Sequence, residues 1–248
     1  MKIVVTGPAG AGKGSLARMI SADYKIPHIS TGELFREQIK AKTEVGKIAD
    51  EYISKGRLVP DDIAVKLLLE RIEKDDCQNG FILDGFPRTV NQARLLSEHI
   101  MIDYLIEIET TAQTVLIRLG GRYMCKTCGQ IHNRRWDSVE KCKDCGGELY
   151  QRTDDTEGVI LRRLDQYHLD TKPIISYYLQ ECGITILDRR YGAMIGTRYG
   201  KKNRRKTKRS KGWTQILNLQ SRLEYSAEDM YKVFGEKYGK LFVKQKTA

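Results

Sequence analysis

The sequence predicts an α/β protein with a parallel sheet of five strands flanked by helices. Short apolar, β-branched runs alternate with helical patterns along most of the chain, and a glycine-rich loop directly follows the first run. Alternation of this kind is typical of parallel sheets that are covered by helices on both faces. The 248 residues are enough for one such domain with insertions.

The first fifteen residues carry the strongest signal. Residues 3–6 (IVVT) read as a buried strand, residues 7–15 (GPAGAGKGS) as a loop, and residues 16–24 as a helix. Glycines let successive N–H groups turn toward one centre, and the helix start adds a positive dipole end. Lys13 supplies a full charge, so the stretch predicts a phosphate-binding loop of the P-loop NTPase kind. Unusually, a glycine follows the lysine, which places the hydroxyl at Ser15.

The pattern of a strand followed by helices then occurs twice more along the chain. Residues 25–30 are expected to form a strand, and a Thr-Gly-Glu sequence at 31–33 opens two or three short helices that close near Gly56. Residues 61–74 form a periodic helix with acids in its first turn. Residues 81–84 (FILD) read as the next strand, and Asp84 at its end is a candidate to hold Mg²⁺, directly or through water.

Helices are then predicted at 89–100 and from 112 to 119, with a fourth strand at 103–109. Residues 157–181 form a long helical stretch with a bend near Pro173, and residues 183–188 form the fifth strand. Residues 213–223 are compatible with a helix. A capping-box pattern at Ser226 predicts a terminal helix.

Two cysteine pairs interrupt the alternation. Each has C-x2-C spacing followed by glycine, and 13 residues separate the pairs. Four thiolates suit tetrahedral Zn²⁺ and fill its coordination sphere, so a structural metal is predicted at Cys125, Cys128, Cys142 and Cys145. His132 is a candidate spare ligand, although the sequence favours a solvent-facing lid residue at this position. Cys77 and Cys182 are expected to be small buried residues.

The amino-acid composition limits the classes of protein to which the chain can belong. The chain is 40% hydrophobic and 30% charged, and it has no apolar run of the ~18 residues that a membrane span needs. With the first strand at the very start, a cytoplasmic location and no membrane contact are expected. The net charge of +11 is local, because residues 189–211 hold 11 basic and no acidic residues, and the remaining 32 bases balance 32 acids. This segment reads as a loop or as disorder.

Arginines near the motifs suggest two phosphorylated substrates that face each other. They are Arg36, Arg88, Arg118, Arg122, Arg152 and Arg163. The spacing of Arg118 and Arg122 predicts that both lie on one side of a helix end. No Asp or His stands out as a proton acceptor, which fits an acceptor phosphate that is already ionised.

Several motifs in residues 1–188 occur in the same order as in a known protein family. They are GPAGAGKGS (7–15), STGELFR (30–36), GRLVPD (56–61), GFILDGFPRTVNQA (80–93), LGGRY (119–123), the two CxxCG units, ELYQRTDD (148–155) and RRLDQYH (162–168). Together they resemble the nucleoside monophosphate kinases, specifically adenylate kinases with a long zinc-carrying lid. The resemblance implies the reaction ATP + AMP ⇌ 2 ADP with Mg²⁺ and a structural Zn²⁺.

The resemblance also implies residue roles. ATP would contact Gly10, Ala11, Gly12, Lys13, Gly14, Ser15, Arg118 and Arg122. AMP would contact Thr31, Gly32, Arg36, Arg57, Val59, Gly85, Arg88, Gln92, Arg152 and Arg163, with Gln92 reading the adenine edge. The catalytic set would be Lys13, Arg88, Arg122, Arg152 and Arg163, and Asp84 would order hydrated Mg²⁺.

The implied organisation is a core, an AMP-binding domain and a lid. The core would hold residues 1–29, 60–120 and 157–248, the AMP-binding domain residues 30–59, and the lid residues 121–156. The chain departs from the family in a short lid hairpin, in Arg189 and Arg190 after the fifth strand, and in a basic insertion over about 190–224.

Three alternatives stay open. The acceptor could be UMP or CMP, although Thr31 and Gln92 favour AMP. The cysteine ribbon and the basic run would also suit binding of RNA or another polyanion as an added property. An inactive relative is the third, and the intact Lys13 and arginine set argue against it. We expect a monomer.

Overall fold

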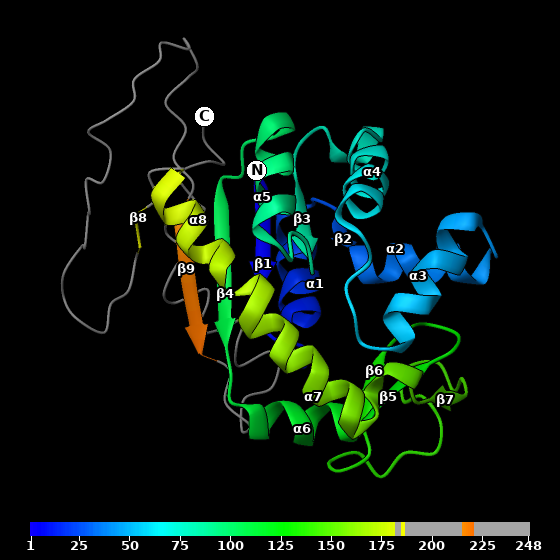
Figure 1. The fold of residues 1–248 in the computed structure, drawn as a ribbon. Helices are drawn as coiled ribbons and strands as arrows, with labels where there is room; N and C mark the ends of the chain where they lie inside the picture. Colours follow the sequence, from blue (N-terminus) through cyan, green and yellow to red (C-terminus); the bar gives the residue numbers. More distant parts are fainter. Residues whose placement is uncertain (182–184, 187–214, 221–248) are drawn as a thin grey trace, which may run out of the picture.

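The computed structural model describes residues 1–181, 185–186 and 215–220 (Figure 1). Cys182, the basic segment 189–211 and the predicted terminal helix lie outside these residues. The described helices of eight or more residues are α1 (Lys13–Tyr24), α2 (Thr31–Lys40), α3 (Glu44–Ser54), α4 (Asp61–Ile72), α5 (Val90–His99), α6 (Ala112–Gly120), α7 (Glu157–Gln166) and α8 (Pro173–Glu181). Within the described ranges, no helix is long and apolar enough to cross a membrane.

The central sheet is parallel and covered by helices, as predicted. Its strands are β1 (Lys2–Thr6), β2 (His28–Ser30), β3 (Phe81–Asp84), β4 (Tyr104–Glu109), β8 (Thr185–Ile186) and β9 (Gln215–Gln220). Their order is β2-β3-β1-β4-β9-β8, and every neighbouring pair is parallel. The described sheet therefore has six strands where the sequence predicts five.

The additional strand corrects one expectation. Residues 213–223 were compatible with a helix, whereas Gln215–Gln220 form β9 and pair with β4 along its whole length. A short apolar run such as ILNL does not distinguish strand from helix by periodicity, and here the open edge of β4 decides. Residues 215–220 lie within the suggested insertion over 190–224, so this part of the segment pairs with the central sheet.

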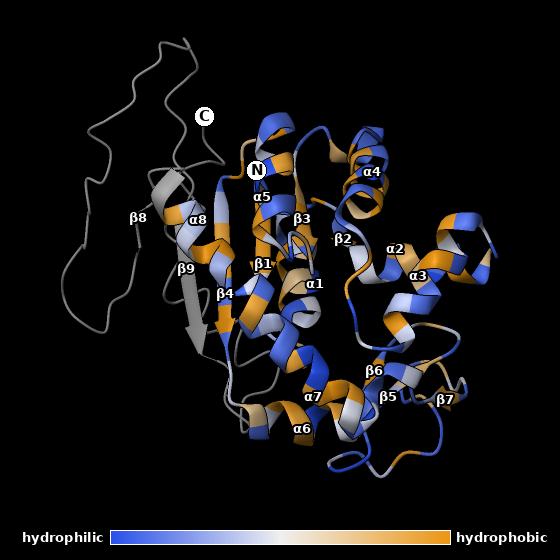
Figure 2. Ribbon diagram, viewed as in Figure 1, coloured by the Kyte–Doolittle hydropathy of each residue, from blue (hydrophilic) through white to orange (hydrophobic). Residues whose placement is uncertain are grey.

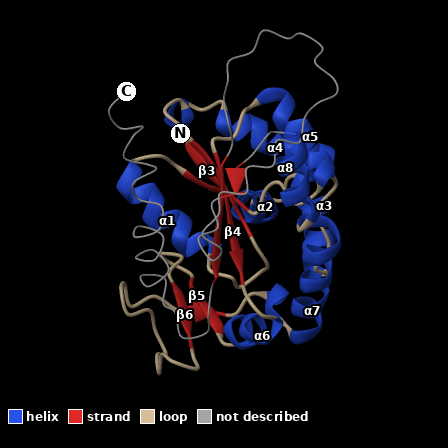
Figure 3. Ribbon diagram, turned by 90° about the vertical axis from the view of Figure 1, so that its left-hand side faces the viewer, coloured by secondary structure: helices blue, strands red, loops and turns tan. Residues whose placement is uncertain are grey.

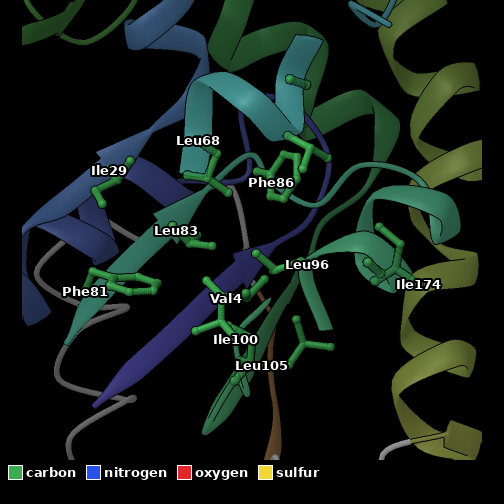
Figure 4. Packing of buried hydrophobic residues seen from close by; sticks show 14 of the residues in the cluster. Val4, Ile29, Leu68, Phe81, Leu83, Phe86, Leu96, Ile100, Leu105 and Ile174 are labelled. Atoms are coloured by element: carbon green, nitrogen blue, oxygen red, sulfur yellow. The ribbon is translucent and has the colours of Figure 1, made fainter. Parts of the chain in front are cut away.

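Helices lie on both sides of the central sheet (Figure 3), and alternate side chains of the strands pack in different clusters. Ile3, Val5 and Ile106 pack with Leu16 and Ile20 of α1 in one buried cluster. The other cluster joins strand residues to α4, α5 and α8, and Figure 4 shows Val4, Leu83 and Leu105 among Leu68, Leu96 and Ile174. Figure 2 shows the corresponding pattern, with hydrophobic strands inside and polar residues on the outer helix faces. Burial on both faces explains why these strands read as continuous apolar runs.

Two smaller parts project beyond the carboxyl ends of the central strands (Figure 1). One consists of α2 and α3. The other is an antiparallel sheet of β5 (Arg122–Cys125), β6 (Ile131–Asn133) and β7 (Leu149–Tyr150). Short helical turns η1 (Asp75–Cys77) and η2 (Thr153–Asp155) and a π-helical turn η3 (Tyr167–Thr171) complete the described chain. The π-helical turn joins α7 to α8 just before Pro173, where the sequence predicts a bend. Ligand sites of open α/β sheets lie at the carboxyl ends of the strands, so the candidate site is at this end.

Candidate active site

The glycine-rich loop lies between β1 and α1. Gly7 has φ 144°, and a Cβ there would lie 2.4 Å from the carbonyl oxygen of Ile108, so the loop can pass β4 only with glycine at this position. Gly12 caps α1 in the left-handed conformation and offers no side-chain acceptor. The first N–H groups of α1 are therefore free of a side-chain cap and, together with the helix dipole, suit an anion.

Lys13 opens α1 and points back into the loop. Its Nζ donates to the carbonyl oxygens of Gly7 and Pro8, each at 2.9 Å. The pKa of Lys13 is lowered to about 8, mainly by burial and also by the charges of Arg88, Arg163 and Arg122, which together outweigh the opposite effect of Asp84. The charge of this lysine is poorly compensated by the protein, and phosphate oxygens would stabilise it.

Asp84 ends β3 beside the loop. Its Oδ2 lies 3.3 Å from Nε2 of His28, and both side chains are largely buried. Burial works to raise the pKa of Asp84, but the hydrogen bond from His28 and the charges of Lys13 and Arg88 outweigh it, so the pKa lies below its usual range. A Cβ at Gly14 would lie 3.1 Å from Asp84 Oδ2, which explains why glycine follows the lysine in this loop.

A single ionised carboxylate beside the phosphate loop fits Mg²⁺. This ion keeps several waters and is usually held by one or two carboxylates together with substrate phosphates. Asp84 and Ser15 both line the large cavity over the loop. These residues are compatible with a hydrated Mg²⁺ bound along with a nucleotide.

The large cavity, of about 340 Å³, extends from the glycine-rich loop to β6. It is lined by every predicted ATP residue except Ala11: Gly10, Gly12, Lys13, Gly14, Ser15, Arg118 and Arg122. Ala11 is fully buried beneath the loop, and its N–H donates to Pro8 at 3.2 Å.

Arg118 and Arg122 meet at this cavity in a different way from the predicted one. The helix α6 ends at Gly120, so Arg118 lies on its last turn and Arg122 is the first residue of β5. Their spacing of four is therefore not a helical one. Arg118 Nη1 lies 3.4 Å from the carbonyl oxygen of Gly10, across the phosphate loop.

A second cavity lies between α2, α3 and the carboxyl end of β3. It is lined by every predicted AMP residue except Arg152: Thr31, Gly32, Arg36, Arg57, Val59, Gly85, Arg88, Gln92 and Arg163. Apolar side chains of Phe35, Leu58, Ala64 and Phe86 complete its wall. Arg36, Arg88 and Arg163 line both this cavity and the large one, so the two cavities meet at these guanidinium groups.

The arginines at this junction repel one another. Burial, together with the charges of Arg163 and Arg36, lowers the pKa of Arg88 to about 10. Burial likewise lowers the pKa of Arg152 to about 10, with Arg36 and Arg122 adding to the effect. Arg88 and Arg152 therefore remain charged at neutral pH. Since like charges are costly to bring together, a cluster of this kind is built to receive multiply charged anions.

Two buried acids, Asp154 and Asp155, organise part of the cluster. Arg122 Nε donates to Asp155 Oδ2 at 2.7 Å, and Arg163 Nη1 donates to Asp154 Oδ2 at 3.0 Å. The side chain of Asp155 is fully buried and lies 3.6 Å from Arg163 as well. Neither acid was among the predicted site residues, although two adjacent acids between candidate arginines are a signal in the sequence.

The four predicted metal ligands come together in the antiparallel sheet. The Sγ atoms of Cys125, Cys128, Cys142 and Cys145 all lie within 4.8 Å of one another. Tetrahedral Zn–S bonds of about 2.3 Å place sulfurs about 3.8 Å apart, so the set fits Zn²⁺. Hydrogen bonds from the N–H groups of Cys128 and Thr127 lower the pKa of Cys125 to about 6, which favours its thiolate, whereas the neighbouring thiol of Cys145 raises the pKa of Cys128.

His132 corrects another expectation. It is only 5% exposed, and its Nε2 lies 3.3 Å from Cys142 Sγ. The strand β6 turns this side chain toward the cysteines, whereas the sequence predicts a solvent-facing residue. Cys77 is buried, as expected.

The fold and site define a P-loop phosphotransferase with two adjoining cavities for phosphate esters. Residues 5–182 match the family model described as adenylate kinase, and the chain belongs to the adenylate kinase family. It is 45% identical over 186 residues to an adenylate kinase of Caldicellulosiruptor bescii, covering 72% of this chain and 86% of that protein. The adenylate kinase of Moorella thermoacetica is 46% identical over 188 residues (73% and 87%), and that of Alkaliphilus oremlandii 42% over 196 residues (76% and 91%).

Proposed function

We propose that this protein is an adenylate kinase that transfers the γ-phosphoryl group of ATP to AMP, reversibly and with Mg²⁺, to give two ADP. The observation that carries the proposal is the sharing of Arg36, Arg88 and Arg163 by the two cavities. Arginines at the junction of two nucleotide sites can grip a donor and an acceptor phosphate at once.

The proposed roles follow the two cavities. The glycine-rich loop, Lys13, Arg118 and Arg122 hold ATP, and the cavity at α2 and α3 holds AMP. Arg36 and Arg88 bind the AMP phosphate, and Arg152 and Arg163 contact both substrates. Asp84 stays ionised beside Lys13 and holds hydrated Mg²⁺, which when bound neutralises charge on the ATP phosphates.

The reaction needs no protein base. The attacking group is an oxygen of the AMP phosphate, which is ionised at neutral pH and loses no proton on attack. Catalysis then rests on placing two anions in line and neutralising their charge as the P–O bond to the leaving ADP breaks. Lys13, Arg88, Arg122, Arg152 and Arg163 provide that charge.

We further propose that residues 30–59 and 121–156 close over the substrates as two mobile domains. In the lid, Zn²⁺ on the four cysteines would stabilise a small antiparallel sheet whose own buried cluster is limited to a few residues. A rigid lid can close as one body and exclude water from the transfer.

A steady-state screen tests the proposal. ADP formation is measured by a coupled assay with ATP and AMP, UMP or CMP, and with a Lys13→Met variant as control. AMP is expected to be the preferred acceptor, with loss of most activity in the variant. Preference for UMP or CMP would assign a different kinase of the same class.

The basic segment 189–211 supports a second, sequence-based proposal. Its 11 basic residues without acids would bind RNA or another polyanion through phosphate contacts. Filter binding across a salt series tests it, and absent or salt-independent binding would overturn it. We also propose a monomer in the cytoplasm, which size-exclusion chromatography and cell fractionation test.

A further inference from the structure

Asp61 lies at the start of α4, behind the wall of the cavity at α2 and α3. Its Oδ1 accepts a hydrogen bond from Gln92 Nε2 at 2.8 Å. Its Oδ2 accepts two more, from Thr89 Oγ1 at 3.0 Å and from Asn91 Nδ2 at 2.9 Å. The carboxylate thus holds the first turn of α5 with one oxygen and the Gln92 side chain with the other.

The opposite end of the Gln92 amide is held as well. Its Oε1 accepts from the backbone N–H of Arg88 at 2.7 Å. A carboxylate only accepts and a backbone N–H only donates, so the partners themselves determine which end of the amide is nitrogen. Rotating the amide by 180° would set oxygen against carboxylate and NH₂ against N–H. Gln92 is 2% exposed, so no water replaces these partners.

These two bonds leave one donor and one acceptor of the fixed amide for a ligand, and Gln92 lines the cavity. An amide nitrogen carries two hydrogens and an amide oxygen two lone pairs, and Asp61 and Arg88 use one of each. The remaining pair matches a base edge with a ring-nitrogen acceptor beside an exocyclic amino group, as in adenine. Hypoxanthine and guanine present the reverse pattern, N–H beside C=O, and would meet donor with donor and acceptor with acceptor.

We propose that Asp61, with the N–H of Arg88, fixes the Gln92 amide so that the acceptor site selects 6-aminopurine over 6-oxopurine monophosphates. The inference rests on the proposed function, since it assigns the nucleoside of the acceptor to this cavity. Asp61 is a positioning residue, because it acts through Gln92 and not on the nucleotide. Sites that hydrogen-bond a substrate discriminate strongly, because a mismatched substrate leaves buried polar groups unpaired.

The test compares kcat/KM for AMP and for IMP, which differ only at the base edge in question. An Asp61→Asn side chain can either accept from Gln92 or donate to it, so one restraint on the amide is lost. We expect the AMP-to-IMP ratio of kcat/KM to fall by about tenfold or more, through KM more than kcat.

Two variants serve as controls. Asp62→Asn removes a neighbouring carboxylate from the same first turn of α4, where Asp62 is exposed. Asn91→Ala removes an Oδ2 contact of Asp61 but leaves its contact with Gln92. Both are expected to keep the wild-type ratio. Thermal unfolding of each variant reports its stability separately.

The outcomes separate the two claims. An unchanged ratio in Asp61→Asn, or an equal fall in Asn91→Ala, would overturn the inference, and so would a wild-type enzyme that uses AMP and IMP equally well. If the wild-type protein forms no ADP from AMP, the proposed function itself fails.

Discussion

The substitution Asp155→Asn tests how the arginine cluster is held together. Asp155 is fully buried, receives two hydrogen bonds from Arg122, and lies 3.6 Å from Arg163. Asparagine keeps the shape and one acceptor but removes the negative charge. Arg122 and Arg163 are then left in a largely buried place with less compensation, among other guanidinium groups.

The magnitude follows from the burial of the pair. At an effective dielectric constant near 20, opposite charges 3.6 Å apart attract by about 4–5 kcal/mol before desolvation is counted. Removing one partner of a buried pair costs about 3–5 kcal/mol. Since asparagine can still accept one bond from Arg122, we expect a loss of about 3 kcal/mol in the free energy of unfolding. In a chain of this size that lowers Tm by about 6–12 °C.

Thermal unfolding and steady-state kinetics measure the effect. Asp165→Asn is the matched control, because Asp165 is exposed on α7 and loses the same charge. The Asp155 variant is expected to lose about 100-fold in kcat, because misplacing transition-state contacts by about 1 Å has that effect. Saturating ATP and AMP should restore more stability to it than to the wild type, since phosphates replace the missing charge. A variant as stable and active as the control would refute this reasoning.

Three further predictions concern other parts of the site. Because the pKa of Lys13 is lowered to about 8, its side chain loses its positive charge as the pH rises past that value. The kcat/KM for ATP should therefore fall above about pH 8. A kcat/KM that stays constant up to about pH 9.5 would contradict this prediction. Removal of the metal with a chelator should lower Tm and activity together, and so should the substitution Cys145→Ser. The control Cys77→Ala should keep the metal content of the wild type, as measured by mass spectrometry. Trp136 is 56% exposed and lines the cavity over the phosphate loop, so ATP should change its fluorescence in a Trp213→Phe background; no change on ATP binding would exclude a contact.

The features that were predictable from sequence are local ones. The strand, loop and helix around Lys13 are consecutive, and the cysteine pairs carry their spacing within a few residues. The end of β3 at Asp84 was also read correctly, because a buried strand and a turn meet there. In each case the signal and the structure lie within the same short stretch.

The features that were missed depend on partners far away in sequence. The strand β9 forms because β4 offers it an edge, and His132 is buried because β6 pairs with β5. Asp61 contacts Gln92 from 31 residues away, and Asp155 contacts Arg122 from 33. No periodicity in the chain announces such contacts, since tertiary packing alone brings the groups together.

In the proposed mechanism, backbone N–H groups and cationic side chains neutralise the phosphate charges, so that the phosphate of one nucleotide can attack that of another. Transfer of label from γ-³²P-ATP to AMP tests it most directly, with the metal-loaded wild-type protein beside Lys13→Met. The account predicts label in the β-position of ADP for the wild type and a loss of most transfer in the variant. Label that stays in ATP, or passes only to inorganic phosphate, would contradict it.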